Sequence, residues 1–156
     1  MTENDLTPNL KALLIFIESH AADIIPDKGT FDPYGILLKR TDGSMQMIFL
    51  ETRDDSAEVL KGNPAQQMIR KIQDMIRVYR NDLAVESAAV VSDAYFHETE
   101  GGEEGSGVRA WLDDRGKQAV LVTIPYEVKD GVFVAEEKWF LPKDRLFLPP
   151  EEELER

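Results

Sequence analysis

The residue set best suited to catalysis is Asp93, Tyr95 and His97, which occupy alternate positions near the end of an expected strand. Because side chains alternate between the two faces of a strand, all three are expected on one face. An imidazole beside a carboxylate and a phenol can carry out general acid–base chemistry. No nucleophile accompanies them at a known spacing, so the preferred interpretation is a strand that leaves the core and becomes polar.

A metal site is the second possibility, centred on His20 with Glu18 and Asp23 nearby on an expected helix. The spacing of three makes His20 and Asp23 neighbours on the helix surface. Zinc needs three or four ligands, and the only other histidine is His97. A histidine on the helix surface is therefore the preferred interpretation, and we expect no metal and no cofactor.

A glycine-rich segment, Glu98–Gly107, holds a cluster of acidic residues: Glu98, Glu100, Glu103 and Glu104. Clustered oxygens suit hard cations, but their order does not match an EF-hand loop. The segment also lacks the Gly-Lys-Ser/Thr ending of a phosphate-binding loop, and its glutamates would repel phosphates. We expect a solvated loop here, the most mobile internal segment of the protein.

Basic residues gather on one expected helix, and they point to binding rather than catalysis. The stretch Lys61–Arg80 has five basic residues and one acid, Asp74, although the whole chain has 18 Lys and Arg against 30 Asp and Glu. A solvated helix face is the usual explanation. The functional alternative is a docking face for an acidic surface, either this protein's own acidic end or a second copy. Its residues are Arg70, Lys71, Arg77 and Arg80.

Two tryptophans, Trp111 and Trp139, fall in adjacent parts of the expected meander. Trp111 shares a strand face with Arg109 and Asp113, which predicts partial exposure. Tryptophan is enriched at binding hot spots but is also a common core residue. The sequence leaves both possibilities open.

Composition limits the remaining classes of function. The chain has 156 residues, no cysteine and a net charge of −12, with 42% hydrophobic residues. These values are ordinary for one globular domain, and they exclude disulfides and cysteine nucleophiles. The negative charge disfavours nucleic-acid binding. The longest early apolar run, Ala12–Ile17, is too short for a bilayer, and the basic start of a signal peptide is missing. We expect a cytoplasmic, bacterial-type protein that binds no membrane.

Residue patterns predict the elements that position these candidates. Thr7 and Pro8 begin a helix that Pro26 ends. The Asp42-Gly43 turn predicts a hairpin. Asn63 and Pro64 begin a second amphipathic helix. Short turns then connect a series of strands into a meander. The expected strands are Tyr34–Arg40, Met45–Thr52, Val85–His97, Val108–Asp113, Gln118–Val128 and Val132–Leu141.

The expected fold is α+β, a single domain over residues 1–142 with one antiparallel sheet of five or six strands. Its element order is helix–hairpin–helix–meander, and both helices are expected mainly on one face. Residues 143–156 are expected to form an extended acidic arm. The predicted core contains Leu13, Ile17, Ile69, Ile72, Ile76, Val90, Leu121 and Ile124.

The segment Phe31-Asp32-Pro33-Tyr34-Gly35, followed by Leu38 and the Asp42-Gly43 turn, resembles a family of small uncharacterised bacterial domains. Those domains place an F-x-P-[FY]-G-like segment before the first hairpin, and Ile124-Pro125-Tyr126 matches their late Pro-Tyr strand end. The resemblance implies no catalytic residue. The element order is also similar to profilin and roadblock-like proteins, which implies a binding or dimerisation module. This chain differs in its last strand, Val132–Leu141, and in ending without a helix.

These observations favour a non-enzymatic protein-interaction module whose partner is itself, as a homodimer, or another protein. The Met45–Thr52 strand carries little charge to prevent edge pairing, and the basic helix offers a complementary patch. Reversing Arg70 and Arg77, or introducing lysine at Ile48, would separate these two interfaces. One alternative is an immunity or antagonist protein whose acidic surface neutralises a basic toxin. The other is a small-molecule enzyme that uses Asp93, Tyr95 and His97.

Overall fold

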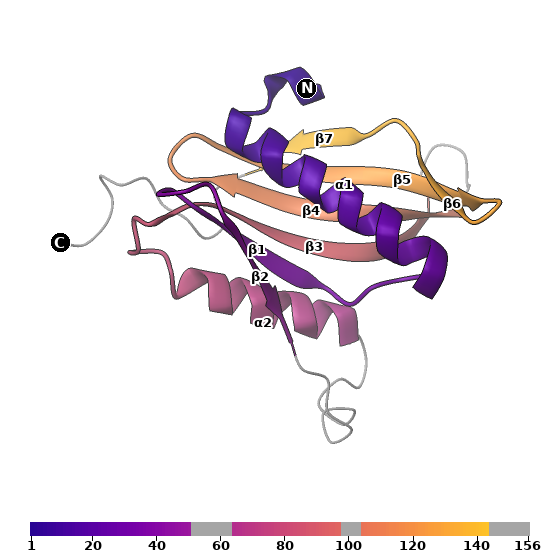
Figure 1. Cartoon of the computed structure of the whole chain (residues 1–156), viewed down its shortest axis with the longest axis horizontal. Helices are drawn as coiled ribbons and strands as arrows, with labels where there is room; N and C mark the ends of the chain where they lie inside the picture. Colours follow the sequence, from indigo (N-terminus) through magenta and orange to yellow (C-terminus); the bar gives the residue numbers. More distant parts are fainter. Residues whose placement is uncertain (51–63, 98–103, 144–156) are drawn as a thin grey trace.

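The computed structural model describes residues 1–50, 64–97 and 104–143 of the chain. It contains two α-helices, a short 3-10 helix and seven strands (Figure 1). The elements are η1 (Glu3–Asp5), α1 (Pro8–Lys28), β1 (Tyr34–Lys39), β2 (Met45–Phe49), α2 (Pro64–Arg77), β3 (Val85–His97), β4 (Glu104–Asp114), β5 (Gln118–Lys129), β6 (Val132–Ala135) and β7 (Trp139–Pro142).

All strands belong to one antiparallel sheet, so the predicted α+β class is confirmed. The strand order is β2-β1-β3-β4-β5-β6, and β7 pairs with β5 beside β6. The sheet has seven strands because the predicted strand Val132–Leu141 is broken. Its first part pairs with Tyr126–Lys129 of β5 and its second part with Val120–Thr123. Between the two parts, the Glu136 amide still donates to the Pro125 carbonyl of β5 (2.7 Å), but residues 136–138 are not in strand conformation, which divides one expected strand into β6 and β7.

Two other segment boundaries differ from the sequence prediction. Residues 104–107 of the predicted glycine-rich loop belong to β4, where Gly107 pairs with Ala94 and Glu104 with His97. The rest of that loop, 98–103, lies outside the described residues, and so does the prediction of its mobility. The predicted acidic arm, 143–156, also lies outside them apart from Lys143.

The first helix begins as predicted and continues beyond its predicted end. The Thr7 hydroxyl accepts a hydrogen bond from the Leu10 amide (3.4 Å), and Pro8 occupies the first turn. Pro26 lies inside α1, two residues before its end. The helix tolerates this proline because its missing N–H and its ring disturb only the last turns. Gly29 ends the helix in the left-handed conformation at φ 82°, and its amide donates to the Ile25 carbonyl (2.7 Å).

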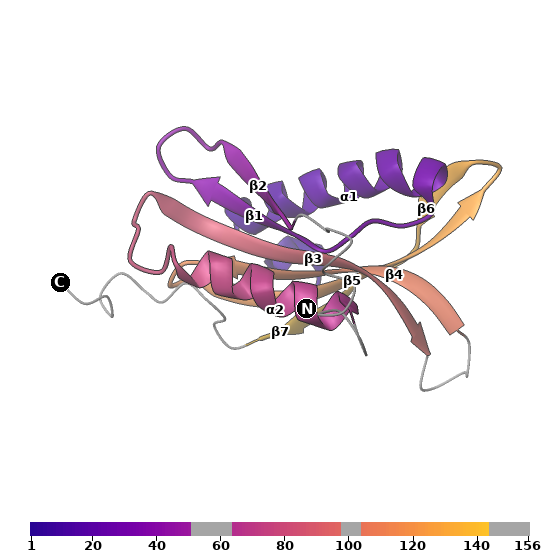
Figure 2. The ribbon, with the colours of Figure 1, turned by 90° about the horizontal axis from the view of Figure 1, so that it is seen from below.

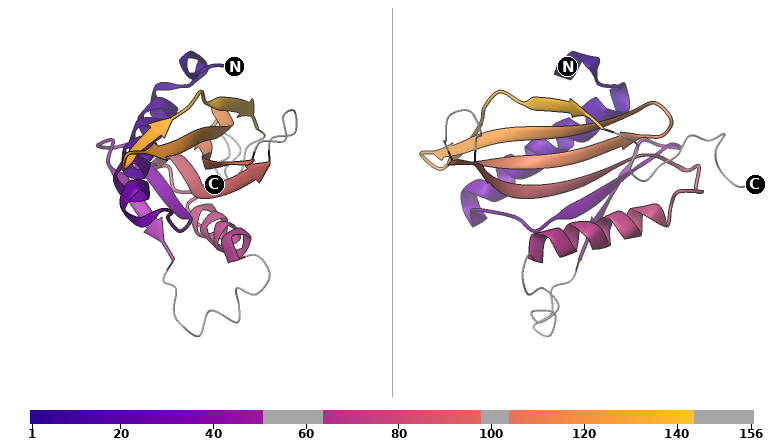
Figure 3. Two further views of the ribbon diagram at one scale, coloured as in Figure 1. Left: turned by 90° about the vertical axis from the view of Figure 1, so that its right-hand side faces the viewer. Right: turned by 180° about the vertical axis from the view of Figure 1, so that it is seen from behind.

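The two helices cover opposite faces of the sheet, which corrects the prediction that they share one (Figures 2 and 3). On β3, Ala89 and Val91 pack with α1, whereas Ala88 and Val90 pack with α2. The reason is that β3 is apolar on both faces. A strand of this kind needs a covering layer on each side, and the sequence offers one helix for each.

The close packing of α2 explains the glycine in the F-x-P-[FY]-G-like segment. A Cβ atom on Gly35 of β1 would lie 2.9 Å from Cγ2 of Ile72 and 3.4 Å from Cδ1 of Ile76. Any side chain here would push α2 away from the sheet. The neighbouring Tyr34 points to the other face, where its side chain is fully buried against α1.

Most of the predicted core residues are buried. Leu13, Ile17, Ile72, Ile76, Val90 and Ile124 are each at most 4% exposed. Ile69 and Leu121 are only half-buried: Ile69 packs against the core beneath α2, and Leu121 lies opposite Trp111 in the strand register. Their incomplete burial has one cause: α2 contacts β1 and β3 and leaves the same face of β4 and β5 without a helix in the described part of the chain.

The turn between β4 and β5 connects both helices to the sheet. The Asp114 carboxylate accepts hydrogen bonds from Ser87 (2.8 Å) and from the Asn9 side chain at the start of α1 (3.2 Å). The next residue, Arg115, is 5% exposed. Its guanidinium donates to backbone carbonyls that follow α2 and to the first residue of β3, at 2.8–3.3 Å: Tyr79, Arg80, Asp82 and Val85.

We predict that Arg115→Met lowers the free energy of unfolding by about 2–4 kcal/mol, because it removes the buried guanidinium that donates to four backbone carbonyls, of which that of Val85 belongs to a fully buried residue. Urea denaturation followed by circular dichroism measures this change. Lys117→Met is the control, since the Lys117 ammonium is exposed and lies 3.8 Å from the Glu86 carboxylate. The control should cost less than about 1 kcal/mol. Equal, small effects of the two substitutions would contradict the anchoring role of Arg115.

Candidate functional site

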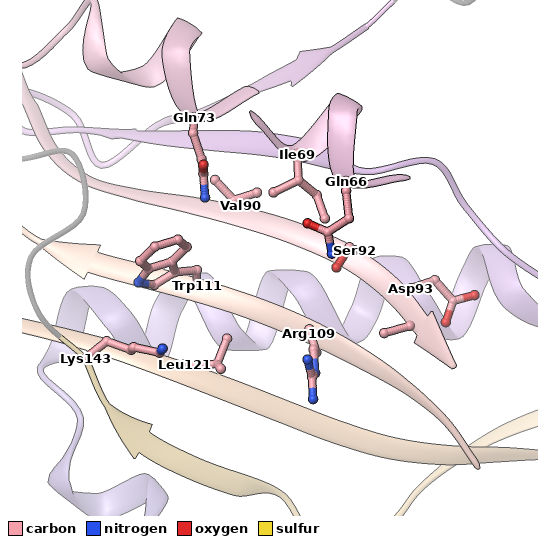
Figure 4. Close-up of a pocket in the computed structure, with 11 residues that line it drawn as sticks. Gln66, Ile69, Gln73, Val90, Ser92, Asp93, Arg109, Trp111, Leu121 and Lys143 are labelled. Carbon is pink, nitrogen blue, oxygen red and sulfur yellow. The ribbon is translucent and has the colours of Figure 1, made fainter. Parts of the chain in front are cut away.

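The candidate site is a groove beside α2, on the part of the sheet that no described helix covers (Figure 4). Its volume is about 570 Å³. One side is formed by α2, the bottom by β3, β4 and β5, and the far side by Lys143, the residue that follows β7. Its lining includes the side chains of Gln66, Ile69, Gln73, Val90, Arg109, Trp111, Leu121 and Lys143.

Apolar side chains form a continuous row across the bottom of the groove. Strand register places Val90 opposite Trp111, Trp111 opposite Leu121, and Leu121 opposite Leu141. Exposure increases along this row, from 4% at Val90 to 58% at Leu141. Trp111 is half-buried, as its shared face with Arg109 predicted. The row therefore presents apolar surface that no described element covers.

Cationic groups border this apolar row. Arg109 lies one row further along the same sheet face, opposite Ser92 on β3 and Thr123 on β5. Its side chain is exposed and forms no ion pair with any residue in the described part of the chain. The Lys143 ammonium lies 6.0 Å from the centre of the Trp111 ring, a cation–π distance. Both cations are thus available to an anionic group in the groove.

The structure divides the predicted basic face of α2. Helical periodicity places Arg70 and Arg77 on the stripe of Gln66 and Gln73, which line the groove. Lys71 lies one residue, or 100°, further round, on the side away from the groove. Arg80 follows the end of α2 in a turn. All four basic side chains are exposed, and Arg77 forms an exposed ion pair with Asp74 (3.0 Å).

The carboxylate of the predicted catalytic set is already hydrogen-bonded on the α1 side of the sheet. Asp93 accepts hydrogen bonds from Tyr126 (2.8 Å) and Thr30 (2.7 Å), one at each oxygen. Burial and the Asp93 carboxylate raise the pKa of Tyr126, so the phenol keeps its proton and remains a donor. Asp93 thus ties β5 to the residues after α1. The side chains of Tyr95 and His97 lie outside the described residues.

The histidine of the predicted metal site lies in an aromatic cluster. The His20 ring stacks on Phe16 at 6.3 Å and meets the Tyr34 ring edge-on at 4.9 Å between centres. Burial lowers the pKa of His20, and Asp23 partly offsets this effect. Glu18 instead forms an ion pair with Lys138 (2.6 Å). Among residues 1–50, 64–97 and 104–143, no three His, Asp or Glu side chains are grouped as metal ligands.

Sequence reasoning placed Arg109 beside Trp111 but did not identify the groove. Gln73 lies on α2 and Lys143 directly follows β7, and both line the groove only because β7 pairs with β5. In the structure, the groove is marked by Ile69 and Leu121, two predicted core residues that are only half-buried.

No protein-family model, curated protein or solved structure matches this chain. In the described part of the chain, no helix is long and apolar enough to span a bilayer. The function of the groove must therefore be argued from its own geometry.

We predict that protonation of His20 destabilises the protein below pH 6.5, its usual pKa. The folded-state pKa is lowered, so the unfolded state binds a proton first and the stability present above pH 6.5 is lost as the pH falls. His20→Phe should reduce this pH dependence of the free energy of unfolding, measured by urea denaturation from pH 7.5 to 5. His97→Gln is the control for the second histidine. An unchanged slope in His20→Phe would contradict the prediction.

Proposed function

We propose that this protein is a non-enzymatic protein-interaction module, and that the groove beside α2 binds a peptide segment with an apolar side chain next to carboxylates. The observation that carries the proposal is the apolar row at Trp111 and Leu121, bordered by Lys143 and by Arg109, which forms no ion pair within the described part of the chain. In a chain of net charge −12, exposed cations with no acidic partner among the described residues, beside an apolar row, are unexpected for a solvated face.

The dimensions and chemistry of the groove support a peptide ligand. A volume of about 570 Å³ lies within the usual range of roughly 300–1,000 Å³ for ligand sites. An apolar side chain would lie on Trp111 against Ile69, and an aromatic contact of this kind is typical of a binding hot spot. A carboxylate next to it would reach the Arg109 guanidinium, which binds carboxylates through two parallel hydrogen bonds. Gln73 would bond to the peptide backbone.

Binding is favoured over catalysis because the described lining residues include no histidine and a single carboxylate, that of Asp93. This carboxylate already accepts hydrogen bonds from Tyr126 and Thr30. Ser92 supplies a hydroxyl, but the residue opposite it on β4 is the cation Arg109, and the side chain of the adjacent Asp93 points to the other face of the sheet. A site of apolar, amide and cationic groups is suited to recognition.

We predict that selection from a random peptide library displayed on phage enriches sequences with an aromatic or large aliphatic residue beside Asp or Glu. For a selected peptide, Arg109→Glu should weaken binding at least about tenfold in fluorescence anisotropy, the equivalent of about 1.4 kcal/mol. Arg109→Lys should weaken it less, because the ammonium keeps the charge but loses the bidentate geometry. Added salt should also weaken binding.

The matched control is Lys11→Glu, which reverses an exposed charge on α1, on the opposite face of the sheet. This variant should bind the selected peptides as the wild type does. Enrichment of basic peptides, or equal effects of Arg109→Glu and Lys11→Glu, would overturn the proposal.

The proposed module also associates with a second copy through the edge of β2. This strand lies at one end of the sheet, and none of its residues is charged. A hollow of about 410 Å³ between β2 and the end of α2 is lined by apolar side chains, of which Phe49 is 59% and Val78 78% exposed. Antiparallel pairing of two β2 strands about a two-fold axis would bury this surface and remove the open edge.

We predict a wild-type mass of twice 17.7 kDa in light scattering, falling to 17.7 kDa at low concentration. Ile48 is 7% exposed and packs in the core, so lysine at that position would test folding rather than association. Phe49→Lys is the better variant and should give a monomer at every concentration. Val128→Lys is the control, because Val128 is a 45% exposed residue on β5, away from β2. A wild type that is monomeric throughout would end this part of the proposal.

A further inference from the structure

We infer that the chain's own segment 144–156 is the first occupant of the groove, so that it competes with any external peptide. This inference rests on the proposed function, and it identifies the peptide ligand as a segment of this same chain. The segment contains Leu146-Phe147-Leu148, followed by Pro149-Pro150 and an acidic cluster. The cluster consists of Glu151, Glu152, Glu153 and Glu155. An apolar residue near carboxylates is the ligand that the groove is proposed to bind.

The starting point of the segment favours this occupant. Lys143, the residue immediately before it, lines the groove and places its ammonium 6.0 Å from the Trp111 ring centre. An extended chain advances at most about 3.3–3.6 Å per residue, so Phe147 can lie up to about 13 Å from Lys143. This reach covers the Trp111 ring and the neighbouring apolar row.

Charge complementarity supports the same placement. The segment carries five acidic and two basic residues, whereas the groove is lined by Arg109, and Arg70 lies on the α2 stripe that also holds the lining residues Gln66 and Gln73. Neither arginine forms an ion pair with another residue in the described ranges. From Lys143, an extended chain can carry Glu151 about 25 Å, far enough to cross from the Lys143 side of the groove to α2.

The covalent connection favours the same chain over a second copy. A short flexible tether gives an effective concentration in the millimolar range, which a separate chain does not reach in dilute solution. The segment therefore occupies the groove before a partner does. The apparent affinity for an external peptide falls by the fraction of molecules in which the groove is already filled.

A spin-label experiment tests this occupancy in the full chain. Because the chain has no cysteine, Leu154→Cys provides a single attachment site for a nitroxide label. The label should broaden the NMR amide signals of groove residues such as Ile69, Gln73 and Arg109, and leave those of α1, such as Lys11, unchanged. Replacing both Arg70 and Arg109 with Glu should abolish the broadening. A label at Lys129→Cys, at the exposed end of β5, is the control.

Three results would overturn the inference. The first is broadening limited to the immediate neighbours of Lys143. The second is broadening that persists in the Arg70→Glu, Arg109→Glu double variant. The third is groove broadening that occurs only between chains, detected when isotope-labelled protein without nitroxide is mixed with unlabelled protein that carries it.

A second measurement separates failure of this inference from failure of the proposed function. Replacing the four glutamates with glutamine in the full chain should strengthen binding of a library-selected peptide by about tenfold, as expected if the segment fills the groove in nine molecules of ten. Unchanged affinity would overturn the inference and leave the proposed function intact. Broadening in the groove without binding of any external peptide would overturn the proposed function and support the segment as the occupant.

Discussion

Two adjacent charged residues, Asp114 and Arg115, hold the helices on opposite faces of the sheet. Asp114 binds the start of α1 through Asn9, and Arg115 binds the carbonyls after the end of α2. Both residues are at most 5% exposed, so their charges are stabilised by the hydrogen bonds that fix the helices. The arrangement of all layers depends on this one turn, because it joins β4 and β5 between the two helices.

The groove is a consequence of where each helix lies on the sheet. α1 has 21 residues, and its contacts extend from β1 to β6. α2 has 14 residues, about 21 Å of helix, and Gly35 lets it lie close over β1 and β3. On the α2 side, no helix in the described part of the chain covers β4 and β5. Surface that a differently placed helix would bury forms the bottom of the groove instead.

The chemistry of the groove follows from what lies at its border. An apolar floor alone would favour non-specific association, but Arg109 and Lys143 add a requirement for negative charge. The net charge of −12 repels acidic partners at long range. In the proposed function, an acidic partner therefore binds only if it also makes apolar contacts with the row. In our proposal, the acidic and apolar segment that follows Lys143 in the sequence is a ligand of this composition, so that recognition and self-occupancy use the same contacts.

Local patterns in the sequence determined the elements: capping by Thr7 and Pro8, the Asp42-Gly43 turn, and the stripe that buries Ile72 and Ile76. These depend on neighbouring residues, so the α+β class and the meander could be read without a structure. Tertiary structure alone decided which face each helix covers, because an apolar stripe does not specify its partner. It also decided that Ile69 and Leu121 border a groove, and that Lys143 meets Trp111. Those contacts join residues far apart in the chain, and only the pairing of β7 with β5 brings them together.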